Sequence, residues 1–143
     1  MSQKLLVAFD GSDPAKNALR YTLETFPKAE VTVLYVIDLP DESWKPFGDD
    51  EEAIDNPFFN RRTERAEEIL DEATQIAADH DHEVDRSTEI GKPAREIVEF
   101  ADSGQFDGII IGNHGRKGAA RVLLGSVAET VVRRSPLPVT TVR

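Results

Sequence analysis

Short apolar runs alternate with segments of helical periodicity along this chain, and this alternation limits the possible folds more than any other feature. Alternating strands and helices favour a parallel sheet whose strands are joined by crossover helices. The pattern predicts five strands, at Lys4–Phe9, Val31–Ile37, Glu83–Glu89, Gly108–Ile111 and Val139–Val142. It also predicts four helices, at Pro14–Thr25, Phe58–Asp79, Ala94–Ser103 and Ser126–Arg134. The expected fold class is therefore α/β.

The length of the chain suits a single domain over residues 1–143. A domain of this size buries roughly two thirds of the surface of its unfolded chain. Its apolar runs are about as long as strands and far shorter than the roughly twenty residues of a membrane helix. The first residues lead straight into a strand without a signal-peptide pattern. We therefore expect a cytoplasmic protein with no membrane partner.

A glycine-rich stretch near the carboxyl end is the segment best suited to bind a ligand. Gly112-Asn113-His114-Gly115 follows a buried strand, and Gly125-Ser126 comes after nine intervening residues, where a helix begins. Glycines let the backbone approach an anion, and the first N–H groups of a helix lie at its positive end. The N–H groups of Ser126 and Val127 are in that position. The stretch therefore predicts a loop that binds a phosphate ester.

The spacing Gly-x2-Gly-x9-Gly-Ser resembles the nucleotide-binding signature of the universal stress protein family. Other segments are similar to that family in the same order, namely Leu5 to Ser12, Leu34 to Asp38, Gly91-Lys92-Pro93 and Ser135 to Val139. The resemblance implies a flavodoxin-like, Rossmann-like α/β/α sandwich with a five-stranded parallel sheet of order 3-2-1-4-5. It also implies that the protein binds ATP, with or without Mg²⁺, and forms a homodimer, as members of this family commonly do.

This strand order brings two distant segments together. The sheet reverses its direction of growth between the first and fourth strands, and ligands bind beyond the carboxyl ends of the strands at that point. Asp10 ends the first strand and Gly112 ends the fourth. The resemblance assigns the nucleotide site to Ala8, Phe9, Asp10, Val36, Gly112, His114, Gly115, Arg116, Gly125, Ser126 and Val127. Asn113 and the Ala8-Phe9 pair depart from the commonest family pattern.

Several of these residues have a second interpretation. Asp10 is expected to contact ribose or a metal ion, but it could instead hold the turn at Gly11-Ser12. His114 could act as a general base, although a contact with ribose or phosphate fits a lone loop histidine better. His80 and His82 stand where a helix should end, so we expect a solvated helix terminus there and no metal site.

Charge argues against a nucleic-acid partner. Asp plus Glu number 27 against 17 Lys plus Arg, so the net charge is -10. Binding to a nucleic-acid backbone depends on cationic side chains, which this balance does not favour. The acid excess also suits a halophile, whose cytoplasm has a high ionic strength that screens self-repulsion.

The connection between residues 38 and 57 is long and acidic and carries Trp44. Its length predicts either a loop that covers a site as a lid or a mobile loop. Trp44 could cover an adenine or anchor its own loop, and the second role is the commoner one for an aromatic residue.

Three classes of function are open. The chain could be an ATP-binding stress-response regulator, a slow ATP hydrolase or nucleotide-dependent transferase, or an interaction module that does not use nucleotide. Gly91-Lys92 is followed by Pro93, which disfavours a P-loop, and no Gly-x-Gly-x-x-Gly motif is present. No set of acid, base and nucleophile can be assembled, so no catalytic residue is assigned. The regulator is the preferred interpretation.

The last strand predicts how the protein assembles. Val139–Val142 should form one edge of the sheet, with unpaired backbone donors and acceptors, and it is rich in β-branched residues. Pairing with its twofold copy would give a homodimer.

Overall fold

The computed structural model describes residues 3–38, 57–113 and 125–143. Its strands are β1 (Lys4–Ala8), β2 (Glu30–Ile37), β3 (Asp85–Ile90), β4 (Gly108–Gly112) and β5 (Val139–Val142). Its helices are α1 (Asp13–Thr25), α3 (Pro57–Asp79), α4 (Pro93–Ser103) and α5 (Ser126–Arg134). Every predicted strand and helix is present, and most ends agree within one residue.

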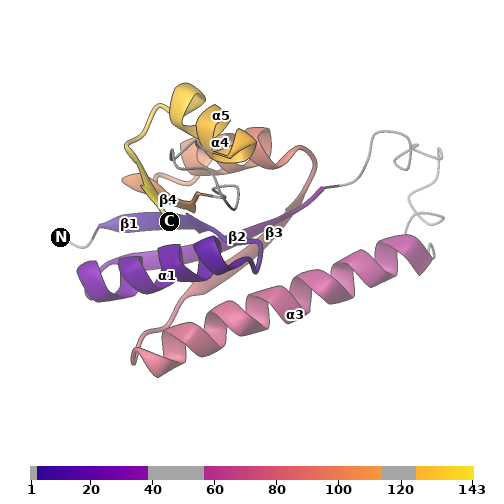
Figure 1. Cartoon of the computed structure of the whole chain (residues 1–143), viewed down its shortest axis with the longest axis horizontal. Coiled ribbons are helices and arrows are strands. Elements are labelled where there is room, and N and C mark those ends of the chain that lie inside the picture. The colour runs from indigo at the N-terminus through magenta and orange to yellow at the C-terminus, as the bar shows by residue number, and fades with distance from the viewer. Residues whose placement is uncertain (1–2, 39–56, 114–124) are drawn as a thin grey trace.

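Within the described residues, the strands form one parallel sheet in the order β3-β2-β1-β4-β5. Helices α1 and α3 cover one face of this sheet, and α4 and α5 cover the other (Figure 1). The expected fold class, an α/β sandwich with the strand order 3-2-1-4-5, is confirmed.

Alternate residues of the central strands pack on opposite faces of the sheet, as the two-residue period of a strand requires. Leu5 and Val7 of β1 pack with α1 and α3, whereas Leu6 and Ala8 pack with α4 and α5. Because both faces are covered, β1 and β4 are buried along nearly their whole length. This explains why they read as continuous apolar runs in the sequence.

The third strand is the element whose start was predicted least well. It was expected to begin at Glu83 but begins at Asp85. The chain leaves α3 through a tight turn, in which Asp81 has a φ of 54° and the His82 N–H donates to the Ala77 carbonyl at 2.9 Å. This turn keeps the chain from extending until after Glu83.

Local signals explain most helix ends. Ser12 caps α1, with its side chain accepting a hydrogen bond from the Ala15 N–H at 3.3 Å. Gly104 and Ser135 end α4 and α5 as expected. The connection that carries Trp44 lies outside the described residues. None of the described helices combines the length and apolar character needed to cross a membrane.

Candidate functional site

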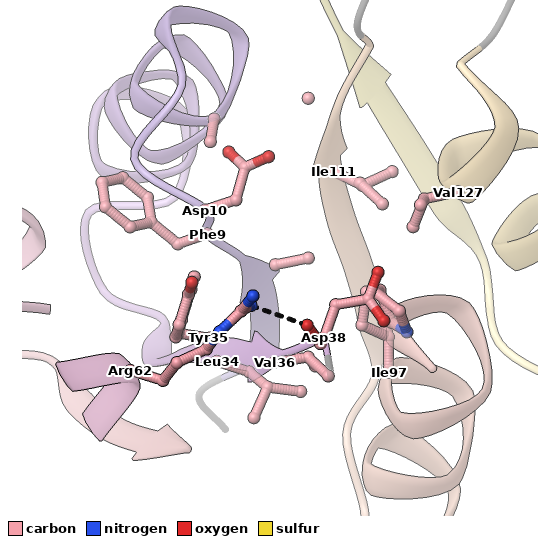
Figure 2. A pocket seen from close by; sticks show the side chains of 14 residues that line it. Phe9, Asp10, Leu34, Tyr35, Val36, Asp38, Arg62, Ile97, Ile111 and Val127 are labelled. Atoms are coloured by element: carbon pink, nitrogen blue, oxygen red, sulfur yellow. Dashed lines mark hydrogen bonds between the residues drawn. The ribbon is translucent and has the colours of Figure 1, made fainter. Parts of the chain in front are cut away.

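A cavity of about 260 Å³ opens at the carboxyl ends of β1, β2 and β4 (Figure 2). This is the edge of the sheet where the strand order reverses, which is the usual place for a ligand in such a fold. Side chains from both helical layers complete its walls. The cavity is lined by Ala8, Phe9, Asp10, Ala15, Leu34, Tyr35, Val36, Asp38, Arg62, Pro93, Ile97, Ile111, Gly112 and Val127.

Gly112 lets α1 pack closely against the end of β4. A Cβ atom at this position would lie 2.5 Å from the carbonyl carbon of Pro14 and 2.6 Å from the Ala15 nitrogen. No side chain fits there, because both neighbours are backbone atoms. The sequence suggested that this glycine admits an anion, whereas the structure supplies a packing reason for it. Gly112 lines the cavity as well, so the close packing also shapes the site.

Asp10 lies at the cavity wall directly after β1 and also holds the turn that follows. Its Oδ1 atom accepts hydrogen bonds from the Ser12 N–H at 3.0 Å and from the Ser12 hydroxyl at 2.5 Å. Gly11 within this turn has a φ of +82°, a conformation that favours glycine. The turn-holding role that the sequence left open is therefore present, and the carboxylate still borders the cavity.

The start of α5 lies beside the cavity. Gly125 is the N-cap residue, Ser126 is the first helical residue, and Val127 lines the cavity itself. The first N–H groups of a helix have no partners within the helix and carry partial positive charge. This end of the cavity therefore favours a negatively charged group.

The structure brings together most of the residues that the sequence placed in the site. Ala8, Phe9, Asp10, Val36, Gly112 and Val127 line the cavity, and Gly125 and Ser126 precede Val127 at the helix start. His114, Gly115 and Arg116 lie outside the described residues.

A second group of lining residues was missed from the sequence. Arg62 of α3 reaches the cavity beside Tyr35 and donates a hydrogen bond from Nη1 to the Asp38 carbonyl at 2.8 Å (Figure 2). Among the described lining residues, the charged side chains are those of Asp10, Asp38 and Arg62. No sequence signal points to Arg62, because its position depends on how α3 packs against β2. Pro93 and Ile97 add an apolar wall from α4.

The two histidines after α3, His80 and His82, do not line this cavity. His80 Nδ1 lies 2.9 Å from the Ile76 carbonyl, at the end of the helix. Within residues 3–38, 57–113 and 125–143, no group of three or more histidine, aspartate or glutamate side chains could hold a metal ion.

Comparison with known proteins agrees with this architecture. The model of the universal stress protein family matches residues 1–143. The universal stress protein MJ0531 of Methanocaldococcus jannaschii is 32% identical over 143 residues, covering 99% of this chain and 82% of that protein. The protein MJ0577 of the same organism is 30% identical over 155 residues, covering 100% of this chain and 96% of that protein.

Solved structures give the same result. The structure of MJ0577 superimposes with a TM-score of 0.76 over 99% of this chain and 96% of that one. A universal stress protein from Archaeoglobus fulgidus in complex with dAMP is 26% identical, with a TM-score of 0.65 over 100% of this chain and 98% of that chain. The family model that matches residues 1–143 and the relatives with 30% identity or more show that this chain belongs to the universal stress protein family.

Proposed function

We propose that this protein binds ATP in the cavity at the ends of β1, β2 and β4 and acts as a nucleotide-dependent regulator of a stress response. The observation that carries the proposal is the meeting of three strand ends and the start of α5 around one cavity. The dAMP complex of the Archaeoglobus fulgidus relative supports an adenine nucleotide as the ligand.

The walls of the cavity suggest how the nucleotide lies. The start of α5 would receive the phosphates, because Ser126 and Val127 are its first two residues and the first N–H groups of a helix bind anions. Asp10 would accept hydrogen bonds from ribose hydroxyls or hold a Mg²⁺ ion that accompanies the phosphates. Val36 would contact the adenine. His114, Gly115 and Arg116 of the glycine-rich loop would complete the contacts to ribose and phosphate.

Slow ATP hydrolysis on the same site is the alternative. Ser126 has no nucleophile-elbow sequence around it, so the sequence gives no reason to assign it as a nucleophile. A regulator that responds to bound ATP through its shape or assembly therefore accounts for the site more simply than a dedicated enzyme does.

Calorimetry with ATP tests this proposal. Gly125→Val places a branched side chain at the helix start, where the phosphates would approach, so we expect its Kd for ATP to rise by at least roughly tenfold. Ser126→Ala is the matched control, because it keeps every backbone N–H group, and its Kd should change little. A parent protein that shows no binding at millimolar ATP would disprove the proposed function.

We also propose that two copies pair through β5. The strand has no charged residue, and the two strand positions that face away from β4 are Val139 and Thr141. This follows because the Pro138 and Val142 carbonyls accept hydrogen bonds from β4, and backbone groups alternate in direction along a strand. Antiparallel pairing with a second copy would satisfy the outward groups.

The acid excess supports a third proposal, that the protein works in a cytoplasm of high ionic strength. At a net charge of -10, like charges repel one another across the folded surface. A Debye length of about 3 Å at 1 M salt would remove most of that repulsion.

A further inference from the structure

Asn113 has an unusual environment for a polar side chain. It follows β4 directly and is only 4% exposed. Among the described residues, the other buried polar side chains are Thr22 and Thr32, and Thr22 donates to the Ala18 carbonyl within its own helix. A buried amide without partners would be costly, so the contacts of Asn113 indicate what it does.

Two hydrogen bonds tie Asn113 to segments distant in the sequence. Its backbone N–H donates to the Val142 carbonyl at 2.6 Å, which extends the pairing of β4 with β5. Its Oδ1 atom accepts the Gly125 N–H at 2.9 Å, across twelve positions of the chain. The orientation of the amide follows from this contact, because a backbone N–H can only donate. Asn113 therefore joins the end of the sheet to the start of α5.

This contact fixes the start of α5, a helix that has no side-chain cap. Gly125 has no side chain, and no side-chain hydrogen bond caps the helix in the usual way. The Gly125 carbonyl accepts the first helical bond, from the Glu129 N–H at 2.9 Å. With its own N–H held by Asn113, Gly125 is fixed from both sides. The next two N–H groups, those of Ser126 and Val127, are then presented from a fixed helix start.

We propose that Asn113 is a positioning residue for the phosphates of the bound nucleotide, and this inference rests on the proposed function. Its side-chain carbonyl holds the start of α5 so that the helix N–H groups meet the phosphates, and it also withdraws the Gly125 N–H from the ligand. Loss of the carbonyl should weaken binding of the phosphates and leave binding of the nucleoside unchanged.

The test compares ATP with adenosine in two variants. Asn113→Leu keeps approximately the shape of the side chain but has no acceptor. We expect its Kd for ATP to rise roughly tenfold, the effect of one lost hydrogen bond beside a charged ligand, while its Kd for adenosine stays within about twofold. Asn113→Asp keeps an acceptor and adds a negative charge beside the phosphates. It should also weaken ATP binding selectively, through repulsion.

Amide hydrogen exchange separates the two variants without any ligand. The Gly125 N–H should be protected in the parent protein and in Asn113→Asp, and should exchange at least about ten times faster in Asn113→Leu. If Asn113→Leu fails to fold, Asn113→Asp decides the matter, because ATP binding equal to that of the parent would overturn the inference.

The opposite results are equally clear. Equal losses of ATP and adenosine affinity in Asn113→Leu would show that Asn113 only supports the fold, and would overturn the inference. A Gly125 amide that exchanges freely in the parent protein would overturn the inference about Asn113 and leave the proposed function intact. A parent that binds adenosine and ATP equally would remove the phosphate assignment, whereas a parent that binds neither would disprove the proposed function itself.

Discussion

The two edge strands of the sheet differ sharply in how well they resist pairing with another strand. β3 carries three charged side chains in its six residues, those of Asp85, Arg86 and Glu89. β5 carries none in its four residues. Charges on an edge strand discourage a further strand from joining the sheet. The charge pattern therefore protects one edge and leaves the other suited to a partner.

The helical layers reinforce this difference. Arg86 of β3 is fastened to α3 by two ion pairs, with Nη1 at 2.8 Å from Asp71 and Nη2 at 2.9 Å from Glu67. The residue after β5 is instead held by a single hydrogen bond, in which the Asn17 side chain of α1 donates to the main-chain oxygen of Arg143 at 3.1 Å. Parallel strands at the two edges of one sheet therefore differ in charge and in how they are tied to the helices.

The largest expected effect comes from altering the β5 edge. Thr141→Pro removes an outward N–H group, and proline is tolerated where that group does not pair within its own sheet. The twofold axis doubles the loss, so the dissociation constant of the proposed dimer should rise by roughly one to two orders of magnitude. Light scattering across a concentration series would measure this change.

Thr141→Ala is the control for that experiment, since it keeps the N–H group and should remain dimeric. A parent protein that is monomeric at high concentration in molar salt would mean that β5 does not pair with a second copy. The absence of charge on β5 would then have no role in assembly.

A moderate effect is expected at the protected edge. Arg86→Met keeps most of the apolar stem but removes both ion pairs, so the free energy of unfolding should fall by about 1–2 kcal/mol. Because the two carboxylates are well exposed, we expect the lower part of that range. Arg65→Met is the matched control, as it removes one exposed ion pair to Glu68 at 3.3 Å. Urea denaturation should show a clearly smaller loss for the control; equal losses would mean that Arg86 does not fasten α3.

Salt should stabilise the whole protein but weaken the ion pairs at the β3 edge. Screening of the acid excess should raise the Tm of the parent by a few degrees, roughly 3 °C, between dilute and molar potassium chloride. The same screening weakens the Arg86 ion pairs, so the stability difference between the parent and Arg86→Met should shrink. Thermal melts at both salt concentrations measure both quantities. A Tm that stays flat or falls would contradict the proposed adaptation to high ionic strength.

The smallest effect concerns the far end of α3. The hydrogen bond from His80 Nδ1–H to the Ile76 carbonyl raises the pKa of His80 above its usual value of 6.5, partial burial opposes the shift, and Glu24 adds to it. A raised pKa stabilises the folded protein fully below pH 6.5, and this stabilisation is lost as pH rises through the higher folded value. Parent stability should therefore decline slightly from pH 6 to pH 8 relative to His80→Gln. Denaturation curves that shift in parallel for both proteins across this range would refute the link.

Much of the fold followed from local patterns. Apolar runs and helical periodicity located every strand and helix of the described residues. An apolar run marks a strand that is buried on both faces, and helical periodicity marks a helix that is buried on one face. The start of β3 was placed wrongly, since the turn at Asp81 depends on a hydrogen bond between His82 and Ala77 that no local propensity reveals.

Some residues of the candidate site could be predicted from the sequence, and others could not. The ends of parallel strands meet at one edge of a sheet, so Asp10, Val36 and Gly112 could be brought together from sequence order and family resemblance. Arg62 could not, because its contact with Asp38 joins residues 24 positions apart and depends on the packing of α3.

The sequence by itself determined the order of elements, the acidic charge, the uncharged last strand and the glycine spacing, because each is a property of composition or of neighbouring residues. Only the tertiary structure decided what two of the loop residues do. Gly112 excludes a side chain because the backbone of α1 lies 2.5 Å from where its Cβ would be, and the buried Asn113 accepts a hydrogen bond from the start of α5. Both facts arise from segments that are distant in the chain and meet only when the helices pack on the sheet.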